Sequence, residues 1–315
     1  MTQPKSESAI ELVNVSRRFG KSTAVDGVSL RIAPGTTCGF IGLNGAGKTT
    51  TIRMMMGLLA PTSGSIHVAG CAMPAERDRA KRLIGYVPDR PTVYPWMTGR
   101  RAIEFCHAIY GSQWDEVLVL NLARTLRLDL NKQVKHLSKG SAAKLSLLLA
   151  VGHGPQVLVL DEPTSGFDVL ARDEFLEGIL MVNSAQQEKP RTVLFSSHAL
   201  GDVQRLADSV AILHQGKLLL HEPIEELLGK TKRIRTVVDD SPDPTVAPPD
   251  TVRESRIGRE WTVTVKNFSN EQVEFIRGKN RVSQLDVQDL SLDEVFRDYV
   301  REATANEETR TAGAL

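Results

Sequence analysis

The sequence predicts an α/β protein whose central sheet carries a phosphate-binding loop, followed by a small second domain. Three observations support this prediction. Residues 42–50 read Gly-Leu-Asn-Gly-Ala-Gly-Lys-Thr-Thr, which satisfies the pattern G-x-x-x-x-G-K-[ST]. Short apolar runs and helical patterns follow one another as far as about residue 230. A Pro- and Asp-rich stretch at 239–250 then precedes a second set of strand and helix patterns.

The bulk composition indicates a soluble chain that can bury a sizeable core. Of its 315 residues, 41% are hydrophobic and 24% are charged, with 39 Lys and Arg against 38 Asp and Glu. This balance offers no basic excess for nucleic acid. No apolar run is long enough for a membrane span, and residues 1–8 lack the apolar core of a signal peptide. Cys38, Cys71 and Cys106 are widely spaced and fit buried thiols in a reducing cytosol.

The elements ahead of the loop are predicted strands at 10–15 and 28–32. Phe19 lies between them. An aromatic side chain ahead of a phosphate loop can stack on an adenine ring. Local sequence alone favours packing of Phe19 in the core, so both roles stay open at this point.

The phosphate loop lies between a predicted strand at 37–41 and a predicted helix at 51–59, the context that the motif requires. A glycine-rich turn that merely caps a helix is the alternative, and this context argues against it. Glycines let backbone N–H groups approach phosphate closely, and the helix N-terminus adds its positive dipole end. Lys48 would reach the β- and γ-phosphates, and Thr49 would offer its hydroxyl to Mg²⁺. The residues expected to bind phosphate are Gly42, Leu43, Asn44, Gly45, Ala46, Gly47, Lys48, Thr49 and Thr50.

Downstream of the loop, residues 83–88 form a predicted strand, and Asp89 follows at its carboxyl end, where ligands gather in open α/β sheets. An Asp in such a loop is more often a turn or a helix cap than a ligand. Residues 98–130 show helical apolar spacing and are predicted as a helical insertion between strands. Its small core is expected to comprise Phe105, Ile109 and Tyr110.

Polar residues follow further predicted elements. Ser138 and Gly140 precede a predicted helix at 142–151, where anion binding is possible but helix capping by Ser138 is the simpler role. A buried strand ends in the adjacent carboxylates Asp161 and Glu162. Asp161 is placed to hold Mg²⁺, and Glu162 to polarise a water against a γ-phosphate. His198 follows the next predicted strand. Polar, titratable residues thus follow three predicted strands, which indicates that they converge on one site.

The order of these motifs resembles the ATP-binding subunits of ABC transporters, over about residues 9–230. The resemblance implies a P-loop NTPase fold of the ABC ATPase type, with a RecA-like core sheet, an antiparallel β subdomain and a helical subdomain at about 90–150. The matching motifs are residues 42–49 (Walker A), 157–162 (Walker B), 137–141 (signature loop), 165–168 (D-loop), Phe19 (adenine-stacking aromatic), Asp89 (Q-loop) and His198 (switch histidine).

The resemblance also implies an activity, hydrolysis of ATP with Mg²⁺. Glu162 would be the general base, and His198 and Lys48 would contact the γ-phosphate. The implied Mg²⁺ ligands are Thr49, Asp161 and Asp89.

The partners implied are a second copy of the chain and a separately encoded membrane permease, with no nucleic acid. Ser138 and Gly140 of one copy would contact the γ-phosphate bound by the other. ATP would close this dimer and hydrolysis would open it, which would drive the permease, an exporter in the leading hypothesis. The subunit would be cytoplasmic and peripheral on the inner face of the membrane. The apolar residues at 93–96 would help to receive the permease.

Three positions depart from the family pattern. Asp89 is shorter than the usual Gln and would reach Mg²⁺ through water. Lys139 and Ser141 change the signature L-S-G-G-Q, and Phe167 replaces a Leu. Hydrolysis is still expected, because Walker A, the Walker B pair and His198 are intact. Two alternatives are a soluble ABC-type switch that is not a transporter, and a weakly hydrolysing nucleotide-gated regulator.

The C-terminal part is predicted as a small α/β accessory domain at 231–300 that dimerises or regulates, with a flexible tail at 301–315. A strand pattern at 260–266, a helix at 270–277 and a strand at 282–287 support it. A capping pattern at Ser291 begins the last predicted helix, and this ending looks like those of ATP-binding subunits of ABC-2-type exporters.

Overall fold

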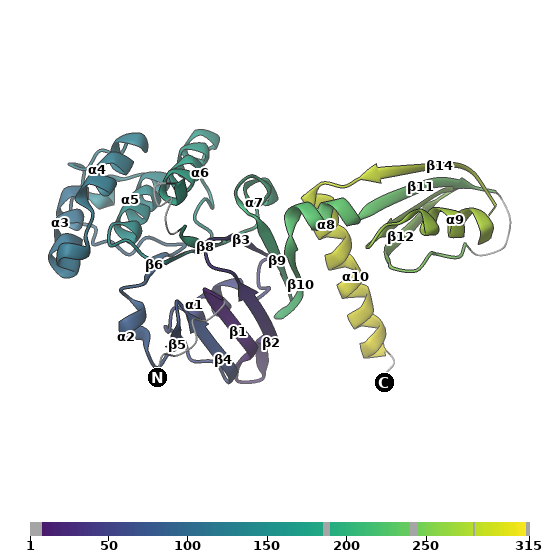
Figure 1. Ribbon diagram of the computed structural model, residues 1–315, viewed down its shortest axis with the longest axis horizontal. Coiled ribbons are helices and arrows are strands. Elements are labelled where there is room, and N and C mark those ends of the chain that lie inside the picture. The colour runs from purple at the N-terminus through teal and green to yellow at the C-terminus, as the bar shows by residue number, and fades with distance from the viewer. Residues whose placement is uncertain (1–7, 185–189, 240–244, 280, 313–315) are drawn as a thin grey trace. The chain divides into compact units, whose positions relative to one another are not determined.

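The computed structural model describes residues 8–184, 190–239, 245–279 and 281–312. It contains two compact units, Met1–His221 and Glu222–Leu315 (Figure 1). The elements of the first unit are β1 (Ile10–Phe19), β2 (Ser22–Ile32), β3 (Thr37–Ile41), α1 (Lys48–Met55), β4 (Ser63–Val68), β5 (Cys71–Met73), α2 (Arg77–Ala80), β6 (Ile84–Val87), α3 (Gly99–Tyr110), α4 (Glu116–Thr125), α5 (Lys139–Val151), β7 (Val157–Leu160), α6 (Val169–Ser184), β8 (Thr192–Ser197), α7 (Leu200–Leu206) and β9 (Ser209–His214). β10 (Lys217–Pro223) crosses the division, and the second unit continues with α8 (Ile224–Lys230), β11 (Lys232–Val238), β12 (Thr251–Ile257), β13 (Glu260–Val265), α9 (Asn270–Lys279), β14 (Val282–Asp289) and α10 (Leu292–Ala312).

The central sheet of the first unit has the strand order β10-β9-β3-β8-β7-β6. β3, β7 and β8 are buried along their whole length, as strands of a parallel sheet covered on both faces usually are. β8 pairs in parallel with β3 on one side and with β7 on the other. The carboxyl ends of these three strands therefore meet at one edge of the sheet.

An antiparallel sheet, in the order β2-β1-β4-β5, packs with α1 against the central sheet. One continuous core joins them, in which Leu12 of β1 and Ile52 and Met55 of α1 cluster with Phe40 of β3. The predicted RecA-like sheet and antiparallel β subdomain are both present. α1 begins at the end of the phosphate loop, so this core fixes the position of the loop.

The helical block contains α3, α4 and α5, as predicted. Its expected core is wrong in part, because Phe105 and Ile109 are exposed. Only Tyr110 of that set packs inward, where its ring stacks on Trp114 and His153. Helical periodicity identified an apolar face of α3, of which Ala102 and Ile103 are buried but Phe105 and Ile109 are not.

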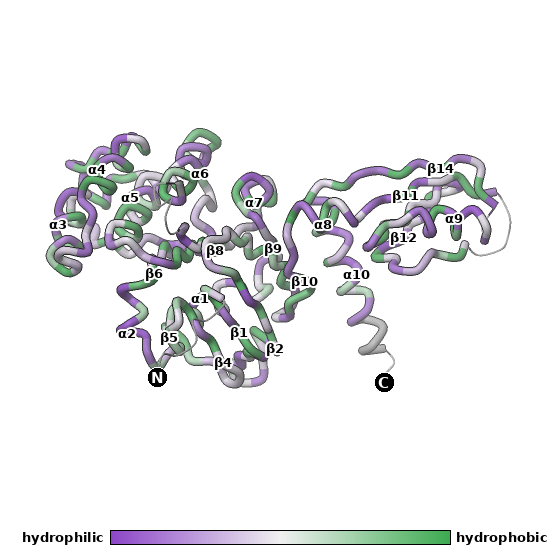
Figure 2. Tube along the Cα trace, in the orientation of Figure 1, coloured by the Kyte–Doolittle hydropathy of each residue, from purple (hydrophilic) through white to green (hydrophobic). Residues whose placement is uncertain are grey.

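The second unit is a small α/β domain whose antiparallel sheet has the order β12-β13-β11-β14. β11 contains both hydrophilic and hydrophobic residues (Figure 2), and the burial of its residues alternates. This alternation puts Ile234 into a core with Trp261, Val263 and Ile276 of α9. The division at His221 lies nine residues before the predicted boundary at 230, since α8 groups with the second unit. The Pro- and Asp-rich stretch connects β11 to β12 within this unit, and its residues 240–244 lie outside the described residues.

The flexible tail predicted at 301–315 is wrong for residues 301–312, which continue α10. This segment contains no Gly or Pro before Gly313, and its Ala and Glu residues favour a helix. Val295, Phe296 and Val300 are buried and anchor the preceding turns of α10. Residues 313–315 lie outside the described residues.

Candidate functional site

The loop before α1 has a backbone that only glycine adopts easily. Gly47 has φ 105°, and an added Cβ there would lie 2.5 Å from the backbone oxygen of Ala24. Gly45 also has a positive φ, of 81°. Lys48 then begins α1, and the Thr51 N–H donates to the Gly47 carbonyl at 2.9 Å. The first N–H groups of the helix are thereby left to face the loop, which suits an anion.

A pocket of about 520 Å³ opens over this loop. It brings together loop residues and side chains that follow β6, β7 and β8, from distant parts of the sequence. Of the predicted site residues, Asp89, Glu162 and His198 join the loop in this lining. The lining residues are Ala24, Leu43, Asn44, Gly45, Ala46, Gly47, Lys48, Thr49, Thr50, Asp89, Glu162, Ser165 and His198.

Glu162, which lines the pocket, is held between the side chains of Lys48 and His198. Its Oε1 lies 3.2 Å from Lys48 Nζ, and its Oε2 lies 2.7 Å from His198 Nδ1. Lys48 Nζ also donates to the Gly42 carbonyl at 2.7 Å, which fixes the lysine across the loop. Glu162 has φ 48°, an unusual backbone for a non-glycine residue, and its carboxylate thereby turns toward the loop. The arrangement suits a base next to a phosphate site.

Asp161 lies beneath the pocket with its side chain almost fully buried. Thr49 Oγ1 and Ser196 Oγ donate to Asp161 Oδ1 at 3.2 Å and 2.9 Å. Burial raises the pKa of Asp161 above its ordinary value, the two hydroxyl donors oppose this change, and the nearby charges of Glu162 and Asp89 add to it.

Ser196 is a site residue that the sequence analysis missed. Its hydroxyl accepts from the Glu162 N–H at 2.8 Å and donates to Asp161 at 2.9 Å, so it holds the Asp161 carboxylate and the backbone of Glu162 at the end of β7. It is fully buried in β8. A pair of serines in an otherwise apolar buried strand, Ser196 and Ser197, was the available signal, because a buried hydroxyl requires a partner.

Comparison of the sequence and the structure with known proteins shows the family to which the chain belongs. Residues 25–165 match the family described as ABC transporter. The chain is 33% identical over 228 residues to the bacitracin transport ATP-binding protein BcrA of Bacillus licheniformis, covering 71% of this chain and 72% of the relative. It is 33% identical over 230 residues to the Nod factor export ATP-binding protein I of Rhizobium etli, covering 70% and 72%.

The chain belongs to the ABC transporter ATP-binding proteins. A solved structure titled as an ATP binding subunit of an ABC transporter matches with a TM-score of 0.62 and 28% identity, covering 70% of this chain and 91% of that one. The predicted fold class and the predicted ATPase are confirmed. The family also supports ATP as the nucleotide that the chain binds and hydrolyses. Among the described residues no helix is long and apolar enough to cross a membrane.

Four residues predicted to bind nucleotide do not line the pocket of this ABC ATPase: Phe19, Gly42, Ser138 and Gly140. Gly42 lies at the start of the loop, where its carbonyl accepts from Lys48 Nζ. Ser138 caps α5, where its hydroxyl accepts from the Ser141 N–H at 3.1 Å and bonds the Ser141 hydroxyl at 2.9 Å. Gly140 is buried against Ala171 of α6. Phe19 is 48% exposed at the end of β1, with the Arg17 guanidinium 4.6 Å from its ring centroid, so the core role that local sequence favoured is wrong. Adenine stacking by Phe19 stays a prediction.

Proposed function

We propose that the chain is the ATP-hydrolysing subunit of an exporter, which dimerises on ATP and drives a separately encoded permease. The observation that carries the proposal is Glu162, 3.2 Å from Lys48 and 2.7 Å from His198 over a phosphate loop. The two relatives named above for transport and export favour a transporter, and the second favours export.

Each of the three central residues has a distinct task. Lys48 at the loop binds the terminal phosphates as a point charge. Glu162 orients and deprotonates the attacking water, since its carboxylate faces the loop. His198 holds Glu162 through Oε2 and lines the pocket. In this proposal it also contacts the γ-phosphate.

The residues around Asp161 fit Mg²⁺. Thr49 Oγ1 and Asp161 Oδ1 lie 3.2 Å apart, and Asp89 lines the same pocket, so all the donors are oxygen atoms. The described residues contain no group of three or more His, Cys, Asp or Glu that could hold a metal alone. Mg²⁺ characteristically uses one or two protein oxygens together with phosphate and water, which matches this sparse set. When bound, it neutralises phosphate charge.

A second copy of the chain accounts for the position of the signature loop. Ser138 and Gly140 lie outside the pocket that contains Lys48, although both belong to motifs of the nucleotide site. We therefore assign them to the nucleotide of a facing copy. The side-chain bond between Ser138 and Ser141 pre-orients the hydroxyl at the start of α5.

The permease would contact the first unit near residues 93–96. Tyr94 and Trp96 are 56% and 57% exposed, and their rings stack with centroids 5.7 Å apart. An adjacent cavity of about 300 Å³ is lined by Val93, Tyr110 and His153 among others. Exposed aromatic residues beside a hollow suit an apolar helix end of a partner.

Glu162→Gln tests the catalytic assignment. It removes the base but keeps the shape, so we expect steady-state ATP turnover to fall by about 10²- to 10⁴-fold, with ATP binding retained and a dimer visible by size exclusion. Glu177→Gln, on the exposed face of α6, is the matched control. Equal turnover in Glu162→Gln and wild type would remove Glu162 from the mechanism.

A double change, Tyr94→Ser with Trp96→Ser, tests the permease surface. The chain is expressed together with its genomic neighbours. We expect the double change to abolish co-purification with a membrane protein while ATP binding stays unchanged. Val117→Ser is the matched control, since Val117 is an exposed apolar residue of α4. Unchanged co-purification of the double variant would place the permease contact elsewhere.

A further inference from the structure

One face of the second unit's sheet is polar across all four strands. Register places Gln288, Arg233, Thr264 and Arg253 in one row across β14, β11, β13 and β12. The next row contains Asp286, Arg235, Thr262 and Ser255. The opposite face carries the apolar core with α9. The polar face is therefore not needed to form the core of this unit.

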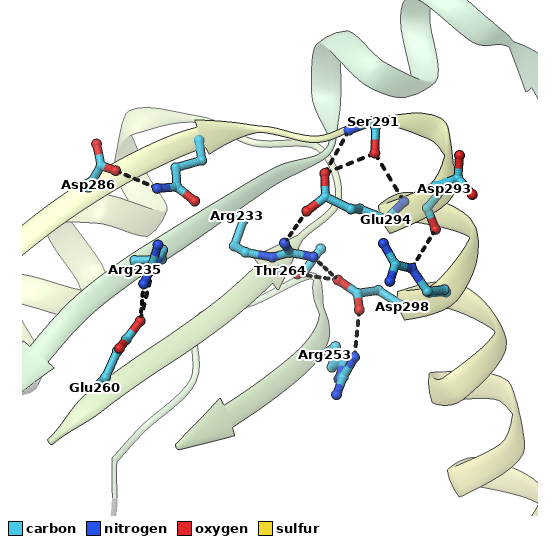
Figure 3. A network of polar contacts seen from close by, with 12 residues as sticks. Arg233, Arg235, Arg253, Glu260, Thr264, Asp286, Ser291, Asp293, Glu294 and Asp298 are labelled. Atoms are coloured by element: carbon cyan, nitrogen blue, oxygen red, sulfur yellow. Dashed lines mark hydrogen bonds and ion pairs between the residues drawn. The ribbon is translucent and has the colours of Figure 1, made fainter. Parts of the chain in front are cut away.

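α10 lies against the first of these rows through acidic side chains. Asp298, whose side chain is 3% exposed, accepts from Arg233 and Arg253 at 2.9 Å each and from Thr264 at 2.7 Å (Figure 3). Glu294 accepts from Arg233 at 2.6 Å. These bonds fix the guanidinium planes of two arginines in place. Fixed guanidinium groups lose little freedom when they bind a further anion.

A cavity of about 370 Å³ lies between this face and α10. Its lining holds five arginines and three carboxylates, so it carries a net of two positive charges. Each carboxylate already has an arginine partner: Glu260 bonds Arg235, Glu294 bonds Arg233, and Asp298 bonds Arg233 and Arg253. The lining residues are Arg233, Arg235, Arg253, Ser255, Glu260, Thr262, Thr264, Gln288, Glu294, Arg297, Asp298 and Arg301.

The excess charge comes from Arg297 and Arg301, four residues apart on one face of α10. Arg297 Nε donates to the backbone oxygen of Asp293 at 3.2 Å, and within the described part of the chain neither arginine forms an ion pair. A network that served only to hold α10 on the sheet would need no further cations in its cavity. Two uncompensated guanidinium groups beside oriented ones instead form a receptor for an anion.

We propose that this cavity binds a phosphate group of a small anionic ligand. Guanidinium groups match the oxygens of phosphate through paired N–H donors, and two unpaired arginines match the charge of a phosphate dianion. Ser255 and Thr262 supply hydroxyl donors on the row that α10 leaves open. The site is separate from the nucleotide pocket, because all of its residues belong to the second unit.

Calorimetric titration of the full chain with pyrophosphate tests the proposal. Wild type is expected to show two classes of site, the phosphate loop and this cavity. Lys48→Ala removes the first class and Arg297→Gln with Arg301→Gln weakens the second by at least about tenfold. Arg277→Gln, an exposed arginine of α9 outside the cavity, is the matched control. Arg301→Gln alone is included as a variant that should not disturb folding, since the exposed side chain of Arg301 makes no bond within the described residues. ATP binding verifies the fold of each variant that keeps Lys48.

A second arm distinguishes a free phosphate compound from a lipid headgroup. The chain is sedimented with phosphatidic acid vesicles or with phosphatidylcholine vesicles. Pyrophosphate binding that depends on Arg297 and Arg301, without vesicle binding, supports a soluble ligand. Vesicle binding that depends on the same arginines and on phosphatidic acid supports a headgroup. If Lys48→Ala binds neither probe, or if Arg297→Gln with Arg301→Gln binds both as wild type does, the proposal is overturned.

Discussion

Ser196→Ala is the sharpest test of how the site is supported. The fully buried hydroxyl accepts from the Glu162 N–H at 2.8 Å and donates to Asp161 at 2.9 Å. Its removal costs one hydrogen bond to a carboxylate and leaves one buried N–H without a partner. Thr49 remains bonded to Asp161 in this variant, so the Asp161 carboxylate keeps one of its two hydroxyl donors. Together these losses amount to about 2–4 kcal/mol in the free energy of opening β7.

Hydrogen exchange of the β7 amides measures this free energy directly. A loss of 2–4 kcal/mol corresponds to a drop in protection of about 30- to 1000-fold. Ser146→Ala is the matched control, because this buried serine of α5 only donates to the Ala142 carbonyl of its own helix and should cost under about 1 kcal/mol. ATP turnover should fall in Ser196→Ala as Glu162 loses its fixed orientation. Equal protection of β7 in the two serine variants would refute the reasoning.

Two carboxylates should respond to pH in opposite directions. Burial raises the pKa of Asp161, so the native state binds a proton at this carboxyl group more tightly than the unfolded chain does. The stability of the protein therefore falls as pH rises through the pKa of Asp161 in the folded state. Asp161→Asn should increase the hydrogen-exchange protection of β7 at pH 7, and this gain should shrink toward acid pH. Burial by itself would raise the pKa of Asp298, but hydrogen bonds from Thr264 and two arginines hold this pKa below the ordinary value. The stabilisation by Asp298 is present above its pKa in the unfolded chain and is lost as pH falls through its pKa in the folded state. Asp298→Asn should therefore lower the free energy that protects the β13 amides from hydrogen exchange at pH 7 by about 3 kcal/mol. Unchanged exchange would contradict the role of the network. Gly47→Ala should lose ATP binding, measured by calorimetry, because the new Cβ meets the Ala24 carbonyl in a backbone with φ 105°.

The sequence predicted the parts of the site that follow strand ends. A glycine-rich loop and an acidic pair each have a local pattern, and parallel strands bring such ends to one edge of a sheet. Thus Lys48, Asp89, Glu162 and His198 were predicted, and the pocket contains all four. Ser196 was not predicted, because its role depends on the backbone of a neighbouring strand rather than on its own surroundings in the chain.

The structure also differs from the predictions where a sequence pattern identifies one face of a helix or strand but not the element that packs against it. The apolar spacing of α3 gave a helix correctly, but Phe105 and Ile109 are exposed. The polar composition beyond residue 301 indicated a flexible tail, whereas helix propensity and the anchored turns of α10 extend the helix to Ala312. The arginine-lined cavity of the second unit depends on the register of four strands, and no local pattern in the sequence records that register.

The place of β8 in the central sheet has a consequence for the synthesis of this protein. β8 lies between β3 and β7, yet it is encoded after both of them. A nascent chain that has reached residue 165 possesses the phosphate loop and the acidic pair, but it lacks the strand that joins them. The nucleotide site therefore assembles late, because β3 pairs with β8 through residues more than 100 positions apart, and an incomplete chain on the ribosome should not capture ATP.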